Sequence, residues 1–117
     1  MLKLYNTLTK SEEIANFPSK EVKIYLCGPT VQSSPHIGHG RSAVVFDFLI
    51  RYLIYIGKEV VFARNITDID DKIIEKSFEQ GIAFNELTSR VSKEFNEAYL
   101  ALNCKTPNYE PKATESI

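Results

Sequence analysis

Residues 22 to 64 alternate between short apolar runs and one long amphipathic stretch, and this order restricts the fold more than any other feature. The β-prone run 22–26 stops at Gly28, which predicts a strand followed by a loop. From Arg41, apolar residues recur at helical spacing, and Gly57 stands where the C-cap of a helix of about twenty residues is expected. Residues 59–64 form a second, mostly apolar run. Together these segments predict a βαβ unit and an α/β fold.

The loop after the first predicted strand contains both histidines of the chain and one of its two cysteines. In a βαβ unit this loop lies at the carboxyl end of the sheet, where α/β folds bind ligands. His36 and His39 are three positions apart at the expected helix start, so their rings share a face, and Gly38 and Gly40 leave room for a ligand. Free amides and partial positive charge at a helix N-terminus favour phosphate.

Two kinds of site fit this loop better than a plain solvent-facing turn. Cys27, His36 and His39 could hold one zinc ion, although usual zinc patterns place ligands in close pairs and no fourth ligand is evident. Alternatively, the histidines donate hydrogen bonds to the charge that develops on a nucleotide's α-phosphate. The second interpretation is favoured.

The rest of the chain predicts two more helices and an irregular tail. One helix follows residues 65–72 and ends at Gly81, and another covers 85–102 with Asn85 as its N-cap. Two prolines exclude regular structure through residues 106–112.

Three acidic residues and the second cysteine are more simply explained by structural roles than by metal binding or a disulfide. Asp68, Asp70 and Asp71 could bind magnesium, but acidic side chains in a first helical turn more often cap it and complement its dipole. Cys104 is expected to be an unreactive thiol near a helix end, and a disulfide with Cys27 is improbable.

Composition narrows the class of protein further. A chain of 117 residues is about one domain, and 44% hydrophobic residues predict a packed core. The net charge of −1 excludes the basic footprint of a domain that binds nucleic acid by itself. No signal-peptide core and no run approaching ~18 apolar residues is present in the sequence, which predicts a cytoplasmic protein.

Several motifs together carry a family resemblance. His36-Ile37-Gly38-His39 matches the HIGH signature of class I aminoacyl-tRNA synthetases. With residues 25–31 before it, Gly40-Arg41 after it and residues 64–74 downstream, the chain resembles the cysteinyl-tRNA synthetase family, and the similarity runs from residue 4 to residue 115.

This resemblance implies a Rossmann-like nucleotide-binding fold, of which residues 1–117 are the first half, the N-terminal part of a class I catalytic domain. The KMSKS loop and the anticodon-binding helices of the family would lie outside this segment. The implied activity is ATP-dependent activation of L-cysteine to cysteinyl-adenylate and its transfer to tRNA(Cys), with Zn2+ as cofactor and ATP with Mg2+ as substrate.

The resemblance also implies roles for single residues. Cys27 corresponds to one of four zinc ligands that capture the substrate thiol, and His36 and His39 correspond to the catalytic histidines that bind ATP and stabilise the transition state. ATP binding is assigned to Pro29, Thr30, His36, Gly38 and His39, and contact with cysteine to Gly28 and Thr67.

The resemblance has departures and rivals. Gln32 to Pro35 replace a loop that often carries a tyrosine and an acidic residue in the family. Rival interpretations are the cysteine ligase of mycothiol synthesis, a small HxGH-type nucleotidyltransferase, and a non-catalytic nucleotide-binding fragment. The segment alone is expected to be inactive as an enzyme and to self-associate through an uncovered sheet edge.

Overall fold

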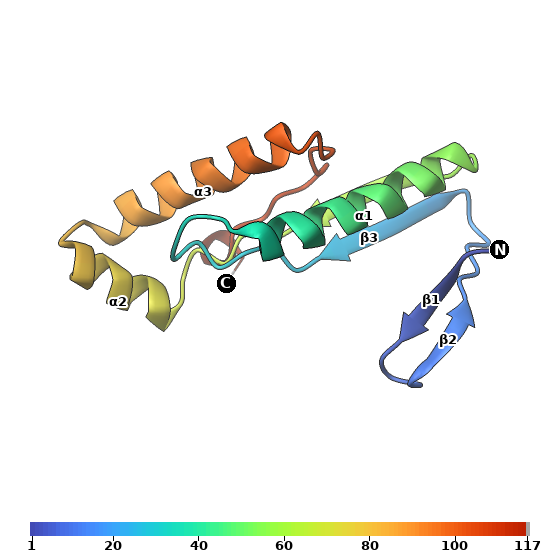
Figure 1. Cartoon of the computed structure of the whole chain (residues 1–117), viewed down its shortest axis with the longest axis horizontal. Coiled ribbons are helices and arrows are strands. Elements are labelled where there is room, and N and C mark those ends of the chain that lie inside the picture. The colour runs from blue at the N-terminus through green and yellow to red at the C-terminus, as the bar shows by residue number, and fades with distance from the viewer. Residues whose placement is uncertain (117) are drawn as a thin grey trace.

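The computed structural model describes residues 1–116 and consists of a small hairpin, a strand–helix–strand unit and a helical hairpin followed by a tail (Figure 1). The elements in chain order are β1 (Lys3–Asn6), β2 (Ser11–Ile14), β3 (Glu21–Leu26), α1 (Ile37–Tyr55), β4 (Glu59–Arg64), α2 (Asp71–Gln80), α3 (Phe84–Ala101) and a 3-10 turn (Ala113–Glu115).

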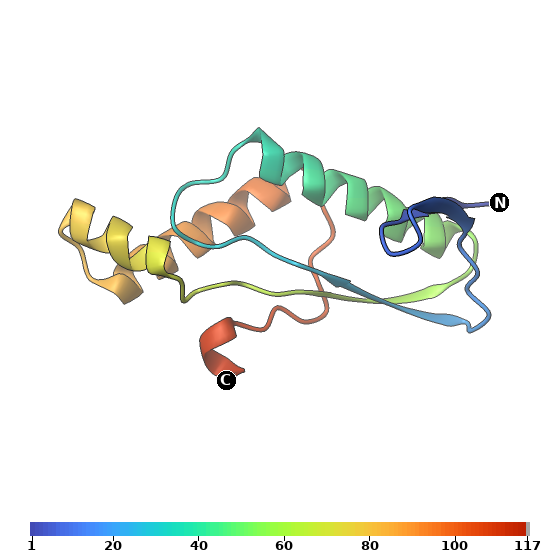
Figure 2. The same ribbon diagram turned by 90° about the horizontal axis from the view of Figure 1, so that it is seen from below.

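The predicted βαβ unit is confirmed. β3 and β4 pair in parallel, with Leu26 opposite Arg64, and α1 runs over one face of the two strands (Figure 2). Leu26, Ile50 and Phe62 are buried between helix and sheet. α1 begins at Ile37, earlier than the hydrophobic periodicity indicates, because its first turn is fixed by polar capping and not by apolar burial.

The two downstream helices are also confirmed, with one correction. Gly81 ends α2 in the left-handed conformation, with φ of 63°. Asn85 is not the N-cap of α3, because the helix begins at Phe84 and Ala83 occupies the cap position without a side-chain hydrogen bond. Phe84 packs against the core shared by α2 and α3, so tertiary packing and not capping fixes this helix start.

The tail contains no helix or strand through residues 106–112, as predicted, yet it is ordered along the outer edge of β4. The Arg64 amide donates to the Tyr109 carbonyl at 3.0 Å, and the Ile66 amide donates to the Pro111 carbonyl at 2.9 Å. A proline can accept such bonds although it cannot donate, so the tail covers this sheet edge without forming a regular strand. Within residues 1–116 the unpaired edge is therefore that of β3.

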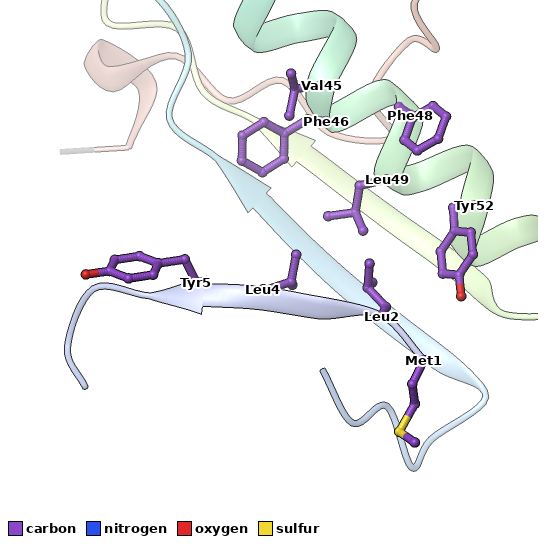
Figure 3. A pocket seen from close by; sticks show the side chains of 9 residues that line it. All are labelled: Met1, Leu2, Leu4, Tyr5, Val45, Phe46, Phe48, Leu49 and Tyr52. Carbon is purple, nitrogen blue, oxygen red and sulfur yellow. The ribbon is translucent and has the colours of Figure 1, made fainter. Parts of the chain in front are cut away.

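The antiparallel β1–β2 hairpin, which the sequence analysis does not predict, lies below the N-terminal end of β3 in Figure 1. An apolar groove of about 680 Å³ separates β1 from residues 45–52 of α1 and lies away from the N-terminus of that helix (Figure 3). Phe48, on one wall, is 74% exposed, so this face of α1 remains largely uncovered within the described residues. No helix between residues 1 and 116 has the length and apolar character needed to cross a membrane.

Candidate functional site

Two loops meet at the carboxyl ends of the parallel strands. The loop between β3 and α1 continues the strand pairing, because the Val31 amide donates to the Thr67 carbonyl and the Thr67 amide donates to the Pro29 carbonyl, each at 3.1 Å. Thr30 and Thr67 are opposite each other in this pairing, so two residues assigned to separate substrates are adjacent. The loop is thereby held by backbone bonds to the segment that follows β4.

Gly28 allows the two loops to approach closely. Its amide donates to Asn65 Oδ1 at 2.6 Å. A Cβ atom added at Gly28 would lie 1.6 Å from the Asn65 carbonyl oxygen, which is backbone and cannot rotate away. Packing alone therefore requires glycine here, whether or not Gly28 also contacts a substrate.

His36 and His39 form a capping box at the N-terminus of α1. His36 Nδ1 accepts a hydrogen bond from the Gly38 amide at 3.1 Å, and His39 Nδ1 accepts one from the His36 amide at 3.2 Å. An acceptor nitrogen carries no proton, so each neutral ring has its N–H at Nε2. The ring centroids are 4.0 Å apart, so both imidazole rings lie together at the positive end of the helix.

The pKa of His39 is lowered from its ordinary value of 6.5, first by burial and then by the nearby charge of His36. Protonation would also remove the Nδ1 acceptor of the capping box. His39 is therefore neutral at pH 7 and acts as a hydrogen-bond donor through Nε2 without carrying charge.

Acidification should consequently destabilise the fold through His39. Because its folded pKa is depressed, the unfolded chain takes up this proton at a higher pH than the folded chain, so stability is complete above pH 6.5 and falls as the pH drops through the folded pKa. The loss of stability is measured as the change in the urea unfolding midpoint between pH 7.5 and pH 5. His39→Gln keeps a capping-box residue that does not titrate and should show a flatter profile. Identical profiles would contradict the prediction.

A small cavity beneath the loop brings several of these side chains together. Its volume is about 80 Å³, and its lining comprises Leu26, Cys27, Gly28, Pro29, His39, Ser42, Ala43, Arg64 and Tyr99. Four residues assigned from the sequence therefore share one cavity, whereas Thr30, His36, Gly38 and Thr67 lie outside its lining. Sequence reasoning missed Arg64 and Tyr99. Two signals could have indicated Arg64: it is a charged residue at the end of an apolar strand, and it begins the motif 64–74.

The cysteines do not form a site with the histidines in this segment. Cys27 is an exposed free thiol, and Cys104 is a buried one whose pKa is raised mainly by burial. Residues 1–116 contain no group of three or more His, Cys, Asp or Glu side chains arranged to hold a metal ion. A complete local zinc site is thus not assembled, and only Cys27 remains as a single candidate ligand.

The acidic residues have structural partners. Asp70 is the N-cap of α2 and accepts from the Lys72 amide at 2.9 Å, which confirms the capping interpretation for this residue. Asp68 does not cap the helix, because its carboxylate accepts from the Thr114 amide at 3.0 Å and hydroxyl at 2.6 Å. Burial acts to raise the pKa of Asp68, but these hydrogen bonds outweigh it and the net shift is downward. Asp68 therefore anchors the tail.

A parallel strand–helix–strand unit with paired donors at its carboxyl edge defines a Rossmann-like nucleotide-binding module. Residues 13–117 match the family described as the tRNA synthetases class I (C) catalytic domain. The chain therefore belongs to the class I tRNA synthetase (C) catalytic domain family.

The curated relatives are named cysteine–tRNA ligases. The protein of Shewanella loihica is 49% identical over 118 residues, covering 100% of this chain and 26% of its own length. That of Rickettsia bellii is 50% identical over 117 residues, covering 97% of this chain and 26% of its own. The Blochmanniella pennsylvanica protein is 48% identical over 118 residues, with 100% and 25% coverage. This chain thus spans about a quarter of the length of these relatives.

Proposed function

We propose that this chain forms the first part of a cysteine–tRNA ligase active site, which uses ATP to activate L-cysteine and transfers it to tRNA(Cys). The observation that carries this proposal is the histidine capping box, which presents two Nε2–H donors beside the loop that carries Cys27. Such donors suit the negative charge that accumulates on an α-phosphate during adenylate formation.

Each residue of the site then has one role. His36 and His39 hydrogen-bond the α-phosphate as the cysteine carboxylate oxygen attacks phosphorus and pyrophosphate leaves. Pro29, Thr30 and Gly38 shape the ATP site around them. Gly28 and Thr67 contact the amino acid, and their position between the paired loops supports that role.

Zinc and magnesium enter the proposal differently. Zinc, when bound, would favour a thiolate over a hydroxyl, and Cys27 would contribute one ligand. The described residues do not fit a complete zinc site, so no step is assigned to the metal. Mg2+ would accompany ATP as part of the substrate. The cytoplasm is the proposed location.

The 117-residue chain alone is expected to catalyse no cysteine-dependent ATP–pyrophosphate exchange, because residues 1–116 assemble no group of three metal-ligating side chains and the chain spans about a quarter of its relatives' length. The assay is incorporation of labelled pyrophosphate into ATP with and without L-cysteine. Cysteine-dependent exchange by the pure chain would contradict this expectation.

Nucleotide binding by the chain itself is tested by NMR. Addition of millimolar ATP should shift the backbone amide signals of His36 and Gly38, because both amides donate within the capping box at which the phosphate is proposed to bind. Adenosine, which has no phosphate, is the matched control and should leave them in place. Equal shifts with adenosine, or none with ATP, would contradict the proposed phosphate site.

A further inference from the structure

Arg64 is more deeply buried than any other charged residue between positions 1 and 116, and it forms an ion pair. Its side chain is 5% exposed, and Nη2 lies 2.9 Å from Glu110 Oε2 on the tail. The guanidinium carbon lies 3.9 Å from the centre of the Tyr99 ring on α3. Arg64 thus links the end of β4 to both α3 and the tail.

One hydrogen-bond donor of this side chain is not satisfied. Arg64 Nε is buried and has no partner among residues 1–116. Folded proteins rarely leave a buried donor unpaired, because it has lost its water and gained nothing in return. An acceptor for this donor must therefore come from a group outside residues 1–116, such as water or a ligand.

Arg64 lines the cavity of about 80 Å³ beneath the loop. It also lines a second cavity of about 220 Å³, which it shares with Glu110 and Tyr99. The smaller cavity has room for one small polar group but not for a whole nucleotide. Arg64 shares its lining with Cys27, Gly28 and His39, and no acidic side chain contributes to it. Glu110 contacts the guanidinium at Nη2 and does not line the smaller cavity. The part of Arg64 that lines the smaller cavity therefore favours an anionic oxygen.

We propose that Arg64 is a substrate-binding residue whose Nε–H donates to an anionic oxygen, a carboxylate or a phosphate, placed in the smaller cavity. The inference rests on the proposed function, since the amino acid and the nucleotide supply those two kinds of oxygen. In this proposal Arg64 supplies a hydrogen-bond donor between the residues proposed to contact cysteine and the histidines proposed to contact ATP.

The test follows the Arg64 Nε–H signal in 1H–15N spectra of the chain, assigned by its loss in Arg64→Lys. L-Cysteine and AMP are added separately, with cysteine methyl ester and adenosine as controls that lack the carboxylate and the phosphate. We expect the signal to shift with L-cysteine and not its ester, or with AMP and not adenosine, and the responding pair identifies the source of the oxygen.

The Gly38 amide serves as an independent reporter of the proposed function. A Gly38 shift without an Arg64 shift would overturn the inference and leave the proposed function intact. An Arg64 shift with AMP but without a Gly38 shift would support the inference and count against the phosphate site, whereas an Arg64 shift with L-cysteine alone would support the inference and leave the phosphate site to the AMP titration. No shift at either position with 10 mM-scale ligand, on the order of the weakest useful affinity, would overturn both.

Variants give a second, quantitative readout. Arg64→Lys keeps the positive charge but removes Nε–H and should raise the Kd of the responding ligand about tenfold, the effect of one lost charge-assisted hydrogen bond. Glu110→Gln removes the ion pair but retains Nε–H, so its Kd should stay within about threefold of the original. Equal weakening in both variants would show that Arg64 acts only by supporting the fold and would overturn the inference.

Discussion

Replacing Gly28 by alanine should lower the free energy of unfolding by about 3 kcal/mol or more, at the upper end of the cost of overpacking. The added Cβ would lie 1.6 Å from the Asn65 carbonyl oxygen and 3.1 Å from Arg64 Cγ. Relief requires the two loops to separate, which would also break the bond between the Gly28 amide and Asn65 Oδ1.

The free energy of unfolding of Gly28→Ala is measured by urea denaturation, with Gly38→Ala as the matched control. At Gly38 the added Cβ would meet only the His36 ring, 2.9 Å away, which can rotate at the cost of its bond from the Gly38 amide. Gly38→Ala should therefore change stability by less than about 1 kcal/mol, aided by the better helix propensity of alanine. A Gly28→Ala protein as stable as Gly38→Ala would show that the close loop contact is not present in solution.

Replacing Glu110 by glutamine should lower the free energy of unfolding by about 2 kcal/mol. Removing one partner of a buried ion pair leaves a buried charge uncompensated, which typically costs about 3–5 kcal/mol. Glu110 is 26% exposed, so water offsets part of this cost. Stacking on Tyr99 retains some stabilisation of the Arg64 guanidinium.

The matched control is Glu79→Gln, which removes a surface partner of Lys76 on α2. That pair has side chains 44% and 60% exposed, so its loss should cost less than about 0.5 kcal/mol. Chemical denaturation of both variants at pH 7 gives the two values. Equal, small effects would mean that the tail does not hold Arg64 in the native state.

The parts of the fold that could be predicted are those whose signals are local. Residues 59–64 and the helix end at Gly57 follow from apolar periodicity and glycine chemistry within a few positions. The β1–β2 hairpin was missed because its strands are exposed and lack a buried alternating face. The tail was predicted irregular, but its pairing with β4 depends on contacts more than forty positions away.

For the candidate site, too, local features could be predicted from the sequence and contacts across the fold could not. The spacing of His36 and His39 predicted that both rings lie at a helix start, which is where they are found. Their proximity is not set by helical geometry, because His36 is the N-cap with extended φ of -128° and ψ of 176°, and the capping-box bonds hold the two rings together. The capping bonds themselves, and hence the Nε2–H tautomers, required coordinates. Arg64 and Asn65 lie in the motif 64–74, but that motif gives no role for either side chain, and Tyr99 lies in no motif, so the contacts of all three had to come from the fold.

The most direct measurement is cysteine-dependent ATP–pyrophosphate exchange by the Shewanella loihica cysteine–tRNA ligase in which the aligned 118-residue segment is replaced by this chain. We expect the hybrid to exchange within about tenfold of its parent, and His39→Gln in the hybrid to reduce the rate by about 10²-fold, the effect of one lost transition-state donor. A folded hybrid without cysteine-dependent exchange, or one indifferent to His39→Gln, would contradict the assignment of this segment to a ligase active site.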